Sequence, residues 1–293
     1  MTGIGLYPEK EEPRLGKLDQ LAASVGGIFA PWLRPSAKRF SRIVQVVHAC
    51  GKELEALSDG EILERSKALR PLLRSQGFRI DLVGKSFALV KEVARRTLGM
   101  PHFDVQLIGG WVILNGMVAE METGEGKTLA ATLPACTAAL AGVPVHIITV
   151  NDYLAQRDTE WMAPIYRSLG ITVGTVVHGM DPAAKRRAYR CDVTYCTNKE
   201  LAFDYLRDRI VLWDRPSPLR LQLEKLYGEG SRVNQLLMRG LHFGIVDEAD
   251  SVLIDEARTP LIISSGGEGV HDPRIYVCAM NLARELVEKQ DSL

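Results

Sequence analysis

A short glycine-bearing segment, METGEGKT at residues 121–128, limits what this chain can fold into more than any other feature. It ends in Gly-Lys-Thr directly before a helical pattern, as phosphate-binding loops do. In such loops glycines let backbone amides turn toward phosphate oxygens, the lysine neutralises the β and γ phosphates, and the threonine hydroxyl can ligate magnesium. The segment therefore predicts a nucleotide site.

This phosphate loop departs from the general pattern at its first position, which holds Met121 instead of glycine. Taken alone, the fragment leaves open a second interpretation, a strand-to-helix turn whose glycines serve packing. The first interpretation makes five consecutive residues candidates for binding the nucleotide, namely Gly124, Glu125, Gly126, Lys127 and Thr128.

A second motif supports the first interpretation. In GIVDEAD (244–250) an apolar strand pattern ends at Asp247 and Glu248. Acidic pairs also follow strands as helix caps, so the motif alone is moderate evidence. With the phosphate loop, however, it supplies the carboxylates that an ATPase needs. We expect Asp247 and Thr128 to hold Mg²⁺. We expect Glu248 to polarise the attacking water and Lys127 to bind the phosphates of ATP.

The segments after residue 126 alternate between two periodicities. Four runs are typical of buried strands and four of helices, which predicts an α/β fold with a parallel sheet covered by helices on both faces. The expected strands are 145–150, 171–177, 192–196 and 242–247. The expected helices are 127–141, 151–169, 181–190 and 198–208.

Helical patterns also precede the phosphate loop. Apolar residues recur at helical spacing over 40–73, where Ser58 and Glu61 form a capping-box pattern, and a further helix is predicted over 85–98, ended by Gly99. Residues 1–36 are interpreted as a loosely ordered extension, with a membrane-surface role as the alternative.

Other segments receive plainer interpretations. Residues 211–240 are expected to form a partly helical surface excursion, and Lys185, Arg186 and Arg187 a solvated helix face. Four residues follow a strand end, where they could line a preprotein or domain interface or cap the next helix: Tyr153, Gln156, Arg157 and Asp158.

Composition excludes several classes of protein. Lys plus Arg and Asp plus Glu each number 36, so the net charge of zero disfavours a nucleic-acid partner. Five cysteines without paired spacing disfavour a zinc site. The most apolar window, 129–150, is broken by Pro134, Gly142 and Pro144, so it does not predict a membrane span.

Longer runs indicate a family. Gln106 precedes the phosphate loop where helicase-like motors place a glutamine that reads adenine, since an amide can donate and accept along one edge. Four runs closely resemble the first nucleotide-binding domain of the SecA family of bacterial protein-export motors, and the resemblance extends over about residues 41–265. The runs are FDVQLIGG (103–110), TVNDYLAQRD (149–158), TNKELAFDYLRD (197–208) and DEADSVLIDEARTPLIIS (247–264).

The resemblance implies a RecA-like nucleotide-binding domain over 37–265, with ATP held by Gln106 and the phosphate loop. It implies that 266–293 begin a preprotein cross-linking domain that is truncated here. Hydrolysis in that family is coupled to moving preproteins through the SecYEG channel. The implied location is therefore cytoplasmic, peripheral at the inner membrane; whether two copies pair as a homodimer stays open.

Some residues depart from the family pattern. Glu122 stands where a basic residue is usual, and Ala249 replaces a valine, which favours a divergent paralogue. A second motor domain with its arginine finger has no counterpart, so we expect weak nucleotide binding and slow hydrolysis. Two alternatives remain at this point: a DEAD-type RNA or DNA helicase, and a non-catalytic interaction module of SecA-like fold.

Overall fold

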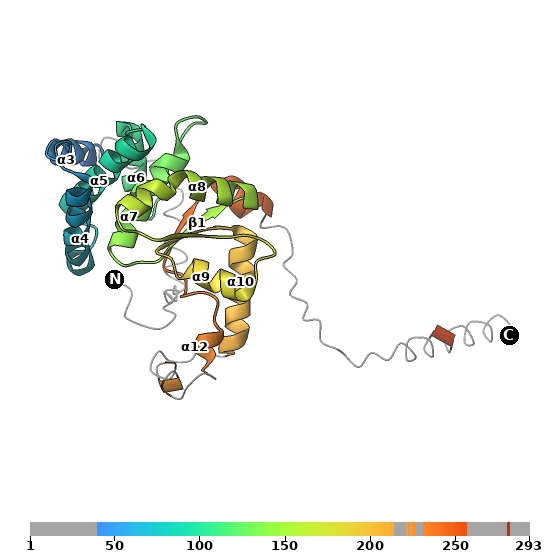
Figure 1. The fold of residues 1–293 in the computed structure, drawn as a ribbon. Helices are drawn as coiled ribbons and strands as arrows, with labels where there is room; N and C mark the ends of the chain where they lie inside the picture. Colours follow the sequence, from blue (N-terminus) through green and yellow to red (C-terminus); the bar gives the residue numbers. More distant parts are fainter. Residues whose placement is uncertain are drawn as a thin grey trace, which may run out of the picture. The chain divides into compact units, whose positions relative to one another are not determined.

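The computed structural model describes residues 40–213, 221, 223, 224, 226, 231–256, 280 and 281. The chain divides into two compact units, Met1–Thr259 and Pro260–Leu293. The fold below is that of the first unit (Figure 1). The extension expected at 1–36 lies outside the described residues, and so do all but two residues of the segment 266–293.

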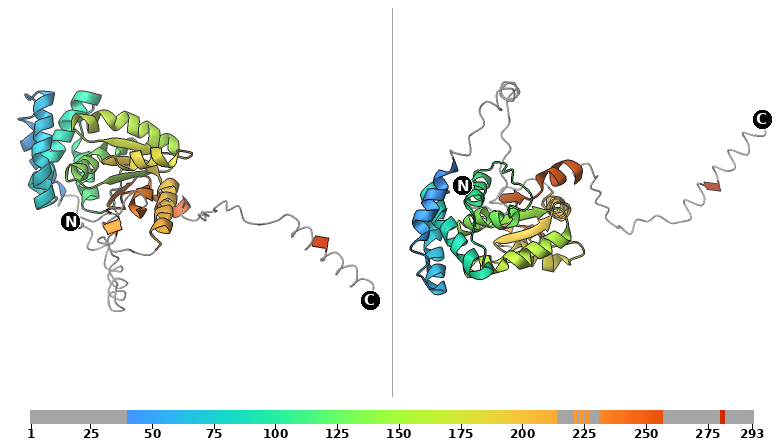
Figure 2. Two further views of the ribbon diagram at one scale, coloured as in Figure 1. Left: turned by 60° about the horizontal axis from the view of Figure 1, so that its bottom comes forward. Right: turned by 90° about the horizontal axis from the view of Figure 1, so that it is seen from above.

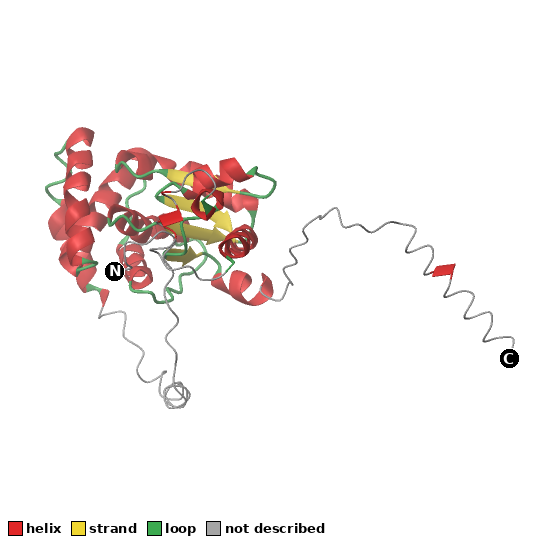
Figure 3. Ribbon diagram, turned by 90° about the horizontal axis from the view of Figure 1, so that it is seen from below, coloured by secondary structure: helices red, strands yellow, loops and turns green. Residues whose placement is uncertain are grey.

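Four parallel strands form the central sheet (Figure 3). Their order is β2-β3-β1-β4, and Val145 of β1 pairs with Val193 on one side and Phe243 on the other. The predicted α/β fold with a parallel sheet is confirmed, and each strand lies within one residue of its expected range. The strands are β1 (Val145–Thr149), β2 (Val173–Val176), β3 (Val193–Thr197) and β4 (Phe243–Val246).

Side chains alternate between the two faces of the sheet. Ile147 and Tyr195 join the larger apolar core, whereas the next residues along the same strands, Ile148 and Cys196, contact the smaller one. Helices α7 (Lys127–Leu140) and α8 (Asp152–Ser168) cover the first face, and α9 (Pro182–Tyr189) and α10 (Asn198–Leu212) the second (Figure 1).

Three of these helices begin where a polar side chain caps the first turn. Asn151 accepts the Leu154 amide at 2.9 Å, Asp181 accepts two amides of α9, and Thr197 accepts one of α10. Helix α10 runs four residues beyond the expected end at 208, because Leu212 is buried in a small apolar cluster.

Three helices that precede α6 in the chain gather at one side of the sheet (Figure 2). They are α3 (Arg42–Gly51), α4 (Asp59–Gln76) and α5 (Ile80–Leu98). The capping box at Ser58 is confirmed, since Glu61 Oε2 accepts the Ser58 amide at 2.7 Å and Ser58 Oγ accepts the Glu61 amide. Gly99 ends α5 in a left-handed conformation, as expected.

Helix α6 (Asp104–Leu114) was not predicted from the sequence. It is apolar nearly all round and contains two glycines, so it lacks the one-sided pattern that marks a surface helix. Gly110 permits a close approach to α7, because a Cβ there would lie 2.9 Å from the Cβ of Leu133. Two further short elements are α12 (Arg232–Gln235) and a π-helical turn, η2 (Ser251–Asp255).

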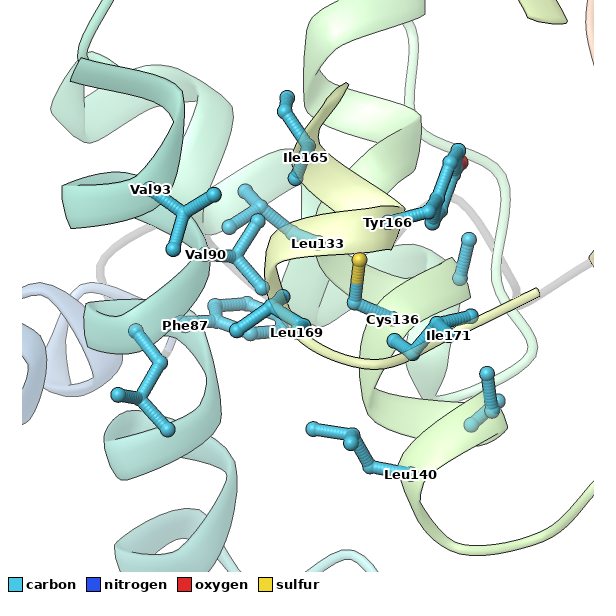
Figure 4. Close-up of a cluster of buried hydrophobic side chains, with 14 of the residues drawn as sticks. Phe87, Val90, Val93, Leu133, Cys136, Leu140, Ile165, Tyr166, Leu169 and Ile171 are labelled. Atoms are coloured by element: carbon cyan, nitrogen blue, oxygen red, sulfur yellow. The ribbon is translucent and has the colours of Figure 1, made fainter. Parts of the chain in front are cut away.

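The main core lies where α5, α7 and α8 meet (Figure 4). Phe87, Leu133 and Ile165, one from each helix, are fully buried, and burying each such side chain contributes about 1.5–3 kcal/mol. Helix α7 is buried almost all round, between α5 on one side and the sheet on the other. It therefore holds the N-terminal helices against the sheet. No helix of the described residues is long and apolar enough to cross a membrane.

The expectation of a solvated face on α9 was wrong for Lys185. Its side chain is buried, and Nζ lies 3.0 Å from both carboxylate oxygens of Asp204 and also contacts Glu200. Tyr189 donates a hydrogen bond to the same Asp204 at 3.0 Å. These four residues, the α9–α10 charge network, join the two helices, whereas Arg187 is exposed as expected.

Two buried histidines predict how stability depends on pH. Burial lowers the pKa of both His102 and His146 to about 4 from 6.5, so both are neutral in the folded state at pH 7. The unfolded chain binds more protons between these values, so stability falls as pH drops below about 6.5. We expect each histidine to cost about 2 kcal/mol between pH 7 and pH 5.

Urea unfolding at the two pH values measures this loss, and His146→Gln should reduce it by about 2 kcal/mol, leaving the contributions of His102 and of His242, whose pKa is also lowered by burial. Glu92 and Glu200, whose pKa values are lowered by hydrogen bonds to basic neighbours against the effect of burial, add their losses only at lower pH. An equal loss in the parent and in a His102→Gln, His146→Gln variant would contradict the assignment.

Candidate functional site

The phosphate loop connects α6 to α7 and is exposed from Glu122 to Lys127. Gly124 and Gly126 have φ angles of 91° and 75°, a left-handed conformation that favours glycine. Gly126 is needed for a second reason, because a Cβ at this position would lie 2.5 Å from Nε2 of Gln106. Helix α7 begins at the next residue, Lys127, so its positive end faces the loop.

Gln106 lies buried on α6 and is joined to this loop. Its Nε2 donates to the backbone oxygen of Glu125 at 2.7 Å, and its Oε1 accepts the amide of Phe103 at 2.9 Å. A glutamine amide has two N–H groups and two lone pairs. Nε2 also donates to the oxygen of Gly126 at 3.5 Å, so both N–H groups have partners in the loop, and one lone pair of Oε1 is left for a ligand.

Asp247 follows the end of β4, where its amide donates to the oxygen of Ile148 at 2.9 Å. Burial raises the pKa of Asp247 above its ordinary value, and the nearby carboxylates of Glu248 and Asp158 raise it further, while the Lys127 ammonium lowers it. Helix α7, which begins at Lys127, packs against β4, and Asp247 follows the end of that strand.

Glu248 has a φ angle of 52°, one of two positive values among non-glycine residues in the described part of the chain. Its amide donates to Oδ1 of Asp247 at 3.1 Å, and its side chain is exposed. Such backbone costs about 1–3 kcal/mol and tends to occur at functional sites. The strain falls on the residue that the sequence interpretation singles out to act on water.

The donor set fits magnesium. Mg²⁺ in phosphate-transfer sites takes one or two carboxylates together with substrate phosphates and waters. Asp247 and the hydroxyl of Thr128 supply such a set, and no group of three or more His, Cys, Asp or Glu side chains arranged to hold a metal occurs within the described ranges.

Sequence reasoning missed the position of Asp158. It is 2% exposed and pairs with Arg157 at 2.7 Å, and the Arg157 guanidinium lies over the ring of Tyr153. Asn151 caps α8, so the suggestion that this run merely caps the helix was wrong. Nothing in the spacing marks Asp158, whose closeness to Asp247 arises from packing of α8 against the sheet.

Glu122 and Glu125 close the loop on itself. The amide of Glu122 donates to Oε2 of Glu125 at 2.9 Å, and the amide of Glu125 donates to the oxygen of Glu122 at 3.3 Å. Both residues are exposed. The charge of Glu122 is therefore in a solvated setting, where its influence on a bound anion is weakened.

An apolar surface lies beside Gln106, at the start of α6. Phe103 is 70% exposed, and Val105 is 57% exposed. Together with Pro101 and Lys91 they line a pocket of about 420 Å³. The sequence interpretation did not single out these residues, because exposure of an aromatic ring is not visible in the local pattern.

Comparisons with known proteins agree with this geometry. Residues 30–292 match the family model described as "SecA DEAD-like domain". The chain is 52% identical to "Protein translocase subunit SecA 2" of Bordetella avium over 88% of its length, and 50% identical to the protein of that name from Nitrosospira multiformis over 96%. It is 44% identical over 86% of its length to "Protein translocase subunit SecA" of a Synechococcus strain.

The chain covers 39%, 42% and 24% of the lengths of these three relatives, respectively. What it matches is therefore one part of each relative. The family model nevertheless covers almost the whole chain, and the phosphate loop, Gln106 and the DEAD motif all lie inside the matched range. The chain therefore belongs to the SecA family, as a SecA DEAD-like domain.

Proposed function

We propose that this domain binds ATP and Mg²⁺ in the site described above. The phosphate loop surrounds the β and γ phosphates with backbone amides, Lys127 neutralises them, and Thr128 and Asp247 hold the metal. The remaining lone pair of the Gln106 amide oxygen accepts a hydrogen bond from the adenine edge. Glu248 polarises the attacking water.

One observation carries this proposal most strongly. Lys127, Gln106 and Asp247 come from three separate segments, yet Gln106 is hydrogen-bonded to the loop, and α7, which begins at Lys127, packs against β4, which Asp247 follows. The carboxyl ends of parallel strands are where α/β folds bind nucleotides. A packing turn requires neither the buried glutamine bond nor the carboxylate near the lysine.

We further propose that the domain is part of a motor that moves preproteins through the SecYEG channel at the cytoplasmic face of the inner membrane. The support is that these relatives are named protein translocase subunits. Two of them are called SecA 2, and this chain carries Glu122 and Ala249 as departures from the usual motifs, which supports a paralogue. We propose that residues 266–293 begin the preprotein cross-linking domain.

The helicase alternative has lost its support, because the matching family model is that of SecA. The interaction-module alternative differs from our proposal in one observable property, since it requires no magnesium-dependent nucleotide binding. Measurement of that property is described in the Discussion.

Glu248→Gln tests the chemical step. We expect this variant to bind ATP within about threefold of the parent and to lose at least 90% of single-turnover hydrolysis, since the amide cannot accept a proton from water. An arginine finger raises the hydrolysis rate of P-loop ATPases by several orders of magnitude. Without one, hydrolysis is expected to be slow, so a single-turnover assay is the suitable measurement. Unchanged hydrolysis in Glu248→Gln would contradict the role of Glu248.

Glu122→Arg tests the departure beside the phosphates. Replacing an exposed like charge by an opposite one near bound phosphates should tighten ATP binding about two- to fivefold, less at high salt. Glu120→Arg makes the same charge change at an exposed position outside the loop and serves as the control. Equal effects of the two variants would mean that only net charge matters.

A further inference from the structure

The first position of the phosphate loop holds Met121, where the general pattern has glycine. Of residues 120–127 it is the one that is not exposed, since its side chain is half-buried. The proposed nucleotide site assigns no role to this side chain. Its sulfur lies against helix α6, at Gly109.

Gly109 makes room for the methionine. It is buried in the middle of α6, and a Cβ at this position would lie 3.3 Å from Sδ of Met121. Nonbonded heavy atoms attract one another best at about 3.5–4.0 Å, so this Cβ would crowd the sulfur. Among the described residues, no other atom outside α6 lies within 4 Å of that position. A glycine on the helix therefore admits the side chain that the loop carries in place of glycine.

One face of α6 contacts both ends of the loop. Gln106 and Gly109 are three residues apart, so they lie on the same side of the helix. Gln106 Nε2 donates to the backbone oxygen of Glu125 at 2.7 Å and to that of Gly126 at 3.5 Å. Gly109 receives Met121. The same helix face therefore contacts the first residue of the loop and the two residues that precede α7.

Hydrogen bonds inside the loop connect these two contacts. The residue after Met121 is Glu122, whose amide donates to Oε2 of Glu125 at 2.9 Å and whose oxygen accepts the Glu125 amide at 3.3 Å. A shift of Met121 is therefore passed on to Glu125 and to the backbone amides beside it. Amides bind oxygen within a narrow range of about 2.7–3.2 Å, so shifts of a few tenths of an ångström affect phosphate binding.

We infer that Met121 and Gly109 form a matched pair that positions the phosphate loop for ATP. Both are positioning residues, because they act through the loop backbone and not on the nucleotide itself. The inference rests on the proposed ATP site. It adds the reason why the loop has a methionine at a position where glycine is usual.

Gly109→Ala separates positioning from folding. Alanine is more favourable than glycine inside a helix, so the midpoint of urea unfolding should be at or above that of the parent. The added methyl crowds Met121, however, and should lower the affinity for ATP with magnesium about threefold or more. Calorimetric titration of the full chain measures that affinity. A purely structural role for Gly109 would not lower affinity while stability is kept.

Gly60→Ala is the matched control. Gly60 also lies in a helix, α4, and a Cβ there would meet no atom of the described residues within 4 Å. This variant receives the same helix-favouring change without crowding a neighbour. It should bind ATP as the parent does.

A second variant tests whether the effect depends on the pair. Met121→Ala removes the thioether and should itself weaken ATP binding about threefold or more, because the loop loses its contact with α6. In that background Gly109→Ala has no sulfur to crowd, so the double variant should bind ATP as Met121→Ala does. Such non-additivity is expected of residues in contact. If Gly109→Ala lowers the urea midpoint, Met121→Ala, which leaves α6 unchanged, is judged by the same threefold criterion.

Nuclear magnetic resonance of the methionine methyl groups tests the contact without nucleotide. The Met121 signal is assigned by its loss in Met121→Ala. It should shift in Gly109→Ala and keep its position in Gly60→Ala.

Two results would overturn the inference while leaving the ATP site in place. One is equal ATP binding by the parent and by both single variants at 109 and 121. The other is a Met121 methyl signal that Gly109→Ala leaves unmoved. Absence of ATP binding by the folded parent would contradict the proposed function itself, and the inference with it.

Discussion

Lys127→Ala is expected to lower the affinity of this chain for ATP about 100-fold. The proposed role of Lys127 is to place an ammonium against the β and γ phosphates, and hydrogen bonds to charged groups contribute about 1.5–3 kcal/mol each. The side chain of Lys127 is exposed, at the first residue of α7. Its removal should therefore leave the fold intact.

Titration with a fluorescent ATP analogue measures the effect on binding. Lys199→Ala is the matched control, since Lys199 also lies at the start of a helix that follows the sheet and is partly exposed, in an ion pair with Glu256. It should bind within twofold of the parent. Equal binding by the parent and Lys127→Ala would show that the phosphate loop does not hold the phosphates.

Asp204→Ala is expected to lower the free energy of unfolding by about 3–5 kcal/mol, as breaking a buried ion pair does. Asp204 is fully buried and holds both Lys185 and Tyr189. Alanine leaves the Tyr189 hydroxyl without this partner and leaves the buried Lys185 ammonium with one carboxylate, that of Glu200, instead of two. The charge on Lys185 is thereby only partly compensated.

Urea unfolding followed by circular dichroism tests this expectation. The control is Arg207→Ala, which removes a partner of the same carboxylate at 3.1 Å but from a side chain that is 54% exposed. Exposed ion pairs contribute less than about 1 kcal/mol, so this variant should unfold close to the parent. A loss below 1 kcal/mol in Asp204→Ala would mean that the α9–α10 charge network does not stabilise the fold.

Local patterns predicted most of the α/β fold. The strands are short apolar runs bounded by turn residues, and their neighbours carry recognisable caps such as Asn151 and Asp181, so both boundaries and type could be read from sequence. Helix α6 was not predicted because it is apolar nearly all round and contains Gly109 and Gly110. Its environment, a slot against α7, exists only in the folded chain.

Tertiary contacts account for the other differences. Three consecutive basic residues at 185–187 predict a solvated face, yet the carboxylates that bury Lys185 come from α10, 15 and 19 residues further on. The same holds for Gln106, whose bond to Glu125 spans 19 residues. Spacing within one helix cannot reveal a partner on another.

In the candidate site, too, the individual motifs could be predicted from the sequence but their arrangement in space could not. Phosphate-loop residues and the DEAD motif are recognisable separately, because each lies at the end of a regular element. The two motifs are brought to the same part of the fold by tertiary packing, since α7, which begins at Lys127, packs against β4, whose end leads into the DEAD motif. Asp158 acts on the pKa of Asp247 because α8 packs against the sheet, and no sequence motif predicts this arrangement.

Calorimetric titration of this chain with ATP, with magnesium and then with EDTA, tests the central claim most directly. The account predicts one saturable site per chain whose affinity falls when magnesium is removed, because Thr128 and Asp247 are proposed to hold the metal against the phosphates. Absence of binding at millimolar ATP, by a chain whose circular dichroism shows it folded, would contradict the nucleotide site and favour a non-catalytic interaction module.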